Sequence, residues 1–132
     1  MSALLDTHAA VWYFLGLREL SPAASQSIRR ALDRGNPIYL SAISIIETIY
    51  LVERGRLPME ALRRLKEGVM DPASGFLVHP VDEDVADAIH QISWSRVPDM
   101  PDRIIAATAL HLGIPLITRD QRLQSAGIPT IW

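Results

Sequence analysis

Short apolar runs alternate along the chain with longer stretches in which apolar residues recur at helical spacing. The short runs end at polar or turn-forming residues, which is typical of buried strands. We predict strands at residues 2–5, 38–41, 76–79, 115–118 and 129–131. The longer stretches predict helices at residues 7–17, 22–35, 44–55, 58–68, 83–92 and 102–112, with a loop at 71–75 and a turn at 97–101.

The alternation of strands with long helices predicts crossover connections, which join parallel strands. We therefore expect an α/β fold with three layers, α/β/α, and a mostly parallel central sheet of four to five strands. At 132 residues, 48% of them hydrophobic, the chain has the size of one domain with one core. We expect that domain to span residues 1–132.

The composition excludes several classes of protein. The absence of cysteine excludes disulfides and thiolate metal sites. We find no basic leader and no long uncharged apolar run, so we expect a soluble cytoplasmic protein without a membrane segment. The net charge of −2 argues against a broad basic surface for nucleic acid. Lys66 is the only lysine among 13 basic residues, a bias that favours bidentate phosphate contacts but that arginine codon usage explains equally well.

Four acidic residues fall where predicted elements meet at one edge of the sheet. Asp6 follows the first strand, Glu47 lies in the first turn of a helix, Asp102 opens a helix, and Asp120 follows the fourth strand. In an open parallel sheet, ligands bind outside the carboxyl ends of the strands. These carboxylates repel one another, and no lysine or histidine adjoins them in the sequence. The pattern therefore favours a site for a hard divalent metal, Mg²⁺ or Mn²⁺.

Each acid also has a structural interpretation. Ser44 and Glu47 fit the spacing of a capping box, and Asp102 and Asp120 each stand where an aspartate stabilises a helix N-terminus. Asp6 differs, because it ends an apolar strand, where a partly buried carboxylate is costly without a partner or a cation. For each acid alone the two interpretations stay open.

Four motifs in one order span almost the whole chain. They are Leu-Leu-Asp-Thr-His at 4–8, Ser-Ala at 41–42 followed by Glu47, Pro-Asp-Arg-Ile-Ile-Ala-Ala-Thr-Ala at 101–109, and Ile-Thr-Arg-Asp at 117–120. The third motif is the most specific of them, and the last is weak alone. Together they resemble the PIN-domain family and, within it, the VapC-like toxins of type II toxin–antitoxin systems.

This resemblance implies a PIN-like fold and the endonucleolytic cleavage of RNA with Mg²⁺ or Mn²⁺ as cofactor. It also implies a VapB-like antitoxin as protein partner. The implied catalytic and metal-binding residues are Asp6, Glu47, Asp102 and Asp120, with Asp99 as a fifth ligand or outer partner.

Supporting residues follow from the same resemblance. Thr118 matches the small hydroxyl residue beside the fourth acid, and Thr7 adjoins the first. Arg103 and Arg119 each adjoin an implied ligand and are candidates for contact with the scissile phosphate, although a local ion pair explains them equally well. We interpret His8 as structural rather than as a proton carrier.

Other function classes fit less well. A PIN-like scaffold that only binds partners would not need all four acids. A receiver-type signalling domain needs an acidic pair after the first strand and a lysine after the last, but Asp6 has no acidic neighbour and Lys66 lies mid-chain. A haloacid-dehalogenase-like phosphatase needs Asp-x-Asp, whereas residues 6–8 supply one carboxylate.

Two apolar runs, at residues 12–15 and 49–52, are too apolar for one face of a helix. Apolar surface that remains after packing on the sheet indicates an interface. We therefore predict a homodimer in which these helices meet across a two-fold axis. The alternative is that both helices are fully buried in the fold.

Overall fold

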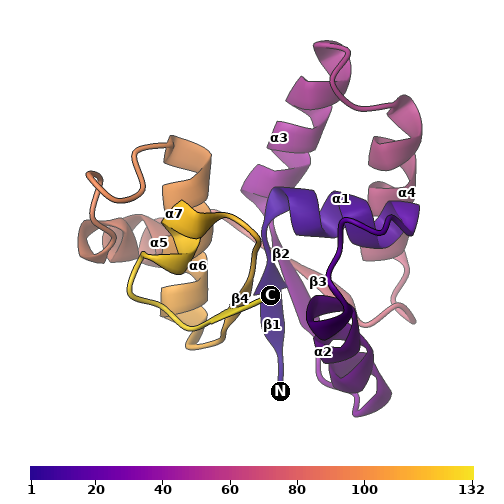
Figure 1. Ribbon diagram of the computed structural model, residues 1–132, viewed down its shortest axis with the longest axis horizontal. Coiled ribbons are helices and arrows are strands. Elements are labelled where there is room, and N and C mark those ends of the chain that lie inside the picture. Colours follow the sequence, from indigo (N-terminus) through magenta and orange to yellow (C-terminus); the bar gives the residue numbers. More distant parts are fainter.

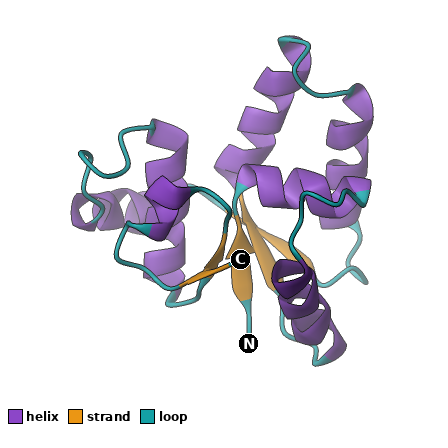
Figure 2. Cartoon of the chain, in the orientation of Figure 1, coloured by secondary structure: helices purple, strands orange, loops and turns teal.

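The computed structural model describes residues 1–132 and contains one sheet of five parallel strands. The strands are β1 (Ala3–Leu5), β2 (Ile38–Ser41), β3 (Phe76–His79), β4 (Leu116–Ile117) and β5 (Thr130–Ile131). Their order across the sheet is β3-β2-β1-β4-β5, and helices cover both faces (Figure 1, Figure 2). The predicted three-layer α/β/α fold is confirmed.

Two groups of helices enclose the sheet. One face carries α1 (Thr7–Leu15), α2 (Pro22–Asp33) and α4 (Met59–Met70), and the other carries α5 (Glu83–Ala88), the 3₁₀ turn η1 (Ile89–Gln91), α6 (Met100–Leu112) and α7 (Gln121–Gln124). α3 (Ala42–Glu53) rises from the end of β2 and pairs with α4, and this pair extends past the carboxyl ends of the strands (Figure 1). None of the helices is both long enough and apolar enough to cross a membrane.

The central strand, β1, is buried on both faces. Leu5 belongs to the apolar core beneath α1 and α2, whereas Leu4 belongs to the core beneath α5 and α6, as the alternation of side chains along a strand requires. Both side chains are fully buried, and each contributes roughly 1.5–3 kcal/mol to folding. Because β1 leads directly into Asp6, this burial holds the carboxylate in the middle of the sheet's carboxyl edge.

The start of α3 lies earlier than we predicted. The Ser41 hydroxyl accepts a hydrogen bond from the Ile43 N–H at 3.2 Å, so the helix begins directly after Ser41 and includes Ser44. The capping-box interpretation of Ser44 and Glu47 is therefore wrong. Glu47 lies in the second turn of α3, not in the first, and its carboxylate is free for another partner.

The start of α6 also lies earlier than we predicted. Asp99 is the residue that caps the helix, and its carboxylate accepts a hydrogen bond from the Asp102 N–H at 3.2 Å. Asp102 thus lies within the first turn and does not precede it. The turn before α6 is correspondingly shorter than 97–101.

A close approach of α4 to α1 explains why Gly68 does not end its helix. A Cβ atom at Gly68 would lie 2.1 Å from Cε1 of Phe14, so only glycine lets the two helices pack at this distance. The helix continues to Met70. We had predicted its end at Gly68, because glycine is common just after a helix.

Candidate acidic active site

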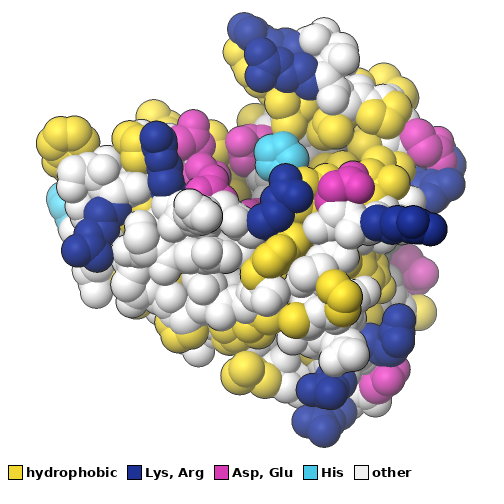
Figure 3. Space-filling view, viewed as in Figure 1, with side chains coloured by type: hydrophobic (Ala, Val, Ile, Leu, Met, Phe, Trp, Pro, Cys, Tyr) yellow, Lys and Arg dark blue, Asp and Glu magenta, His cyan; other side chains and the backbone are white.

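The carboxyl edge of the sheet gathers five acidic side chains from separate parts of the chain. Four of them surround the fifth: the charges of Asp99, Asp120, Glu47 and Asp6 all raise the pKa of Asp102. Acidic side chains beside a histidine are visible where the two groups of helices meet (Figure 3). The structure therefore brings together all five acids that the sequence had indicated.

Asp6 is held in one orientation by bonds to both of its carboxylate oxygens. Its Oδ1 accepts a hydrogen bond from the Ala9 N–H at 2.8 Å, which caps α1, and its Oδ2 accepts one from the Thr118 hydroxyl. The Asp120 N–H donates to the same Thr118 oxygen at 3.0 Å. Burial raises the pKa of Asp6 above its ordinary value, and these hydrogen bonds offset part of the rise.

Glu47 is held by a second threonine. The Thr7 hydroxyl donates to Oε1 of Glu47 at 2.5 Å and lies 2.9 Å from the hydroxyl oxygen of buried Ser44. Burial raises the pKa of Glu47, and the hydrogen bond from Thr7 offsets part of this rise. Because Thr7 follows Asp6 directly, one short segment orients acids from both β1 and α3.

Asp102 lacks such stabilisation. Burial and then repulsion, from Asp99 most strongly, raise the pKa of Asp102 to about 7, and no hydrogen bond to its carboxylate lowers it. Near neutral pH the carboxyl group of Asp102 is therefore partly protonated when no cation is present.

Asp99 and Asp120 lie at the exposed rim of the acidic cluster. Each caps a helix with one oxygen: Asp99 accepts from the Asp102 N–H, and Asp120 accepts from the Arg122 N–H at 2.8 Å. The capping interpretation of Asp120 is thus confirmed. A cap engages one carboxylate oxygen, so the other remains open to solvent or to an ion.

The donor set has the chemistry of a hard-cation site. All five candidates are carboxylates, and oxygen is the ligand that Mg²⁺ and Mn²⁺ prefer. A divalent cation would offset the cost of burying these charges and the repulsion between them, the two causes that raise the pKa values of Asp6, Glu47 and Asp102. As the side chains stand, no three Asp, Glu or His residues are close enough to share one ion. The residues fit a divalent cation by the chemistry of their oxygen donors.

Comparison with known families identifies the fold family of the chain. The model of the PIN domain matches residues 3–129. The chain belongs to the PIN-domain family. The matched range includes all five acids of the cluster, and the resemblance inferred from the motifs is confirmed.

Relatives of this PIN domain include a curated protein of almost the same length. Ribonuclease VapC22 of Mycobacterium tuberculosis is 32% identical over 139 residues, which cover 99% of this chain and 98% of that protein. A toxin–antitoxin complex from Klebsiella pneumoniae contains a chain with 26% identity and a TM-score of 0.65, covering 98% of this chain and 96% of that chain. VapBC2 from Rickettsia felis, bound to a DNA fragment from its promoter, gives a TM-score of 0.73 at 14% identity, covering 98% and 97%, and is similar in fold.

A cavity of about 220 Å³ opens beside the acids of the PIN domain, lined by Asp6, His8, Trp12, Arg119 and Asp120. His8 is exposed and its ring lies 5.7 Å from that of Trp12, and its interpretation as a structural residue stays a prediction. Burial raises the pKa values of Asp6 and Glu47, and the positive charge of His8 partly offsets both rises. The structure therefore places a histidine beside these acids, although no histidine adjoins an acid in the sequence.

Arg103 points into the PIN fold. Its Nη2 donates hydrogen bonds to the backbone oxygens of Ile89 at 3.0 Å and Ile92 at 2.8 Å, and its Nε is buried without a partner. These hydrogen bonds to the end of η1 favour a structural role for Arg103, and its contact with the scissile phosphate stays a prediction. Its structural effect is to join η1 to the first turn of α6, which carries Asp102.

Two residues at the site escaped the sequence analysis. Trp12 was assigned to a dimer face, and Ser44 to a helix cap. A signal for Trp12 was present, because His8 and Trp12 are spaced i, i+4 and so share the face of α1 that follows Asp6. No local pattern indicates that Ser44 lies beside Thr7, since 37 residues separate them.

Proposed function

We propose that the protein is an endoribonuclease that acts as the toxin of a toxin–antitoxin pair. The match to the PIN domain over nearly the whole chain supports this, as does a full-length relative named as a ribonuclease. The observation that carries the proposal is the convergence of Asp6, Glu47, Asp102 and Asp120 at one edge of the sheet.

The proposed cofactor is Mg²⁺ or Mn²⁺, held by Asp6, Glu47, Asp102 and Asp120, with Asp99 as an additional contact. The chemistry that such an ion supplies is Lewis-acid activation of water and neutralisation of charge at the phosphodiester. Burial first, and then repulsion between the acids, raises the pKa values of Asp6, Glu47 and Asp102, and a bound cation would offset both costs, which supports the assignment.

The chain itself orients the carboxylates. Thr118 and the first turn of α1 hold Asp6, and Thr7 holds Glu47, so neither side chain must be ordered when the substrate binds. The reaction is hydrolysis: water adds to the phosphorus and the P–O bond to the neighbouring nucleotide breaks. No protein nucleophile is required.

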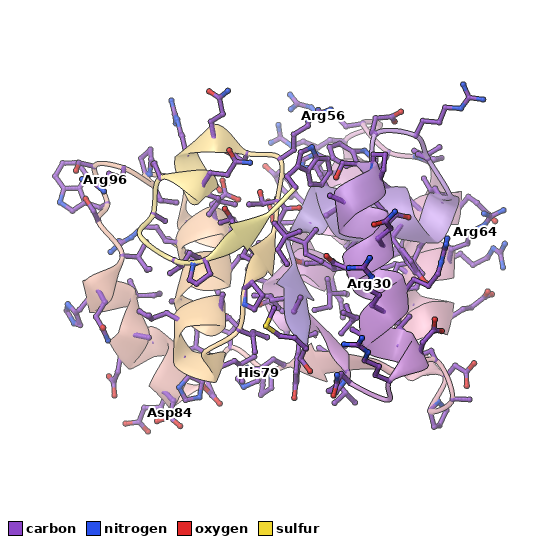
Figure 4. All side chains as sticks on the ribbon, turned by 60° about the horizontal axis from the view of Figure 1, so that its bottom comes forward. Arg30, Arg56, Arg64, His79, Asp84 and Arg96 are labelled. Carbon is purple, nitrogen blue, oxygen red and sulfur yellow. The ribbon has the colours of Figure 1, made fainter.

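Several basic side chains lie away from one another: Arg30, Arg56, Arg64 and Arg96 belong to different parts of the chain and project in different directions (Figure 4). Arg119 is the arginine that lines the cavity beside Asp6 and Asp120. We propose that it contacts RNA next to the scissile bond.

The proposed protein partner is a VapB-like antitoxin. A groove of about 340 Å³ beside the acids is lined by Ile43, Ile46, Glu47, Tyr50, Leu51, Asp99 and Pro101. Its apolar residues suit an amphipathic segment, and the adjoining carboxylates suit an arginine from that segment. Solved relatives of this PIN domain occur in toxin–antitoxin complexes, which supports the assignment.

Cleavage by the purified protein in the presence and absence of metal tests the proposal. RNA cleavage should stop in EDTA and return with Mg²⁺ or Mn²⁺, and Asp102→Asn should remove most of it. Asp87→Asn is the matched control, because Asp87 is an exposed acid in α5 outside the cluster. Undiminished cleavage in EDTA would exclude the metal mechanism. Absence of cleavage with either metal would favour the alternative, a PIN-like scaffold that only binds partners.

A further inference from the structure

Arg119 is held by an aromatic ring and not by an acid. Its Cζ lies over the indole of Trp12, 4.6 Å from the ring centroid. Asp120 is its neighbour in sequence and Asp6 lines the same cavity, yet Arg119 forms a salt bridge with neither. The guanidinium therefore keeps its charge and its N–H donors free at the rim of the acidic site.

Trp12 is held in place by contacts on the side away from Arg119. Its indole packs against the apolar core and lies 5.8 Å from the ring of Trp132, at an interplanar angle of 60°. The His8 ring lies 5.7 Å away on the same side of α1. Successive aromatic contacts thus support the guanidinium, which limits the entropy that Arg119 loses when it contacts a ligand.

The place of Trp12 and Arg119 beside the acidic cluster indicates which ligand they would contact. Trp12 and Arg119 line the same cavity of about 220 Å³ as Asp6 and Asp120, two of the proposed metal ligands. The Arg119 guanidinium lies over the indole and is exposed, and unpaired nucleobases stack on the planes of arginine and aromatic side chains. A base inside a duplex has both faces covered by its neighbours.

We propose that Trp12 and Arg119 form a stacking subsite for one unpaired base beside the scissile phosphate. The inference rests on the proposed ribonuclease function and names the part of the substrate that this side of the site reads. In this proposal Arg119 binds the RNA mainly by stacking on the base, and its positive charge contributes less to the affinity.

Abasic scanning of a short single-stranded RNA tests the subsite. Each nucleotide in turn is replaced by an abasic one, and kcat/KM is measured with Mg²⁺ or Mn²⁺. Kd is measured separately with Ca²⁺, a hard cation that the same oxygen ligands accept. Wild-type protein should lose roughly 5- to 100-fold at one position beside the scissile bond, as expected for the loss of one stacked base. The other positions should change much less.

Arg119→Lys separates stacking from charge. Lysine keeps the positive charge but lacks the planar face, so this variant should lose the same factor on intact RNA and become insensitive to the abasic nucleotide. Trp12→Leu should behave alike, with its thermal stability measured in parallel because Trp12 also packs against the core. The matched control is Arg54→Lys, since Arg54 lies over Tyr50 at the same 4.6 Å, and its cleavage should match that of the wild type.

The outcomes separate the subsite from the ribonuclease proposal. Cleavage without a positional abasic penalty, or a penalty that persists in Arg119→Lys, overturns the subsite and leaves the ribonuclease standing. Abasic-sensitive binding with Ca²⁺ but no cleavage with Mg²⁺ or Mn²⁺ supports the subsite and overturns the ribonuclease. Absence of both binding and cleavage overturns both proposals.

Discussion

The Thr118 hydroxyl donates a hydrogen bond to the carboxylate of Asp6 across 112 residues of sequence. The two residues follow β4 and β1, which are adjacent in the sheet, so the bond forms only when these strands pair. The Asp120 N–H donates to the same hydroxyl and joins a third position of the proposed metal site to this network. The orientation of the Asp6 carboxylate therefore depends on the pairing of β1 with β4.

Thr118→Val should weaken both folding and cleavage. Valine keeps the shape of the side chain but leaves Oδ2 of buried Asp6 without its donor, which costs roughly 1–3 kcal/mol. Cleavage should fall about tenfold or more, because the carboxylate is no longer held in one orientation. Thr108→Val is the matched control: its buried hydroxyl donates to the Ile104 backbone oxygen at 2.7 Å, away from the acids. Equal losses of cleavage in both variants would contradict the role of Thr118.

Asp102→Asn should stabilise the metal-free protein while it removes most cleavage. Burial and the neighbouring acids raise the pKa of Asp102 from 3.8 to about 7, so between these values the folded protein binds more protons than the unfolded chain. The free energy of unfolding in EDTA should therefore fall as the pH rises from about 4 to about 7. Thermal melts at several pH values should show a smaller fall for Asp102→Asn than for wild type or Asp87→Asn. A variant that is less stable than wild type at pH 8 would argue for a structural role.

Arg103→Ala should affect stability far more than RNA binding. The substitution removes the hydrogen bonds to the backbone oxygens of Ile89 and Ile92, a loss of roughly 2–4 kcal/mol. Chemical denaturation measures this loss. The salt dependence of RNA binding should stay that of the wild type, whereas Arg119→Ala should reduce it, since an exposed cation that contacts RNA releases counterions. A reduced salt dependence in Arg103→Ala would instead support its contact with the scissile phosphate.

The predicted homodimer now rests on α3 alone. Trp12, Tyr13 and Phe14 pack against the core of their own chain, whereas Ile49 and Tyr50 are exposed. Light scattering at micromolar concentration should give a dimer mass for wild type and a monomer mass for Ile49→Glu. The control Met59→Glu changes an exposed apolar residue of α4 and should remain dimeric. A monomeric wild-type protein would end the dimer prediction.

The succession of the five strands and of the helices α1 to α6 along the chain, and the edge of the sheet at which the acids meet, follow from the sequence by itself. Hydrophobic periodicity is a local property, so the apolar runs around Leu5 and Leu40 identify buried strands without knowledge of their neighbours. Parallel strands place their carboxyl ends together, which is sufficient to bring Asp6, Glu47 and Asp120 to one edge. The helix starts were less accurate, because a serine or an aspartate three residues away fits a capping pattern equally well.

Only the tertiary structure decided which partners these side chains have. The donors to Asp6 and Glu47 come from Thr118 and Thr7, whose distances from their acceptors along the chain are 112 and 40 residues. Arg103 and Arg119 illustrate the same limit, because each follows or precedes an acid in the sequence, yet one binds backbone oxygens and the other lies over an indole. A local sequence pattern indicates which side chains are polar. Which polar groups pair with one another depends on the strand order in the sheet and on helix packing, because these bring distant segments together.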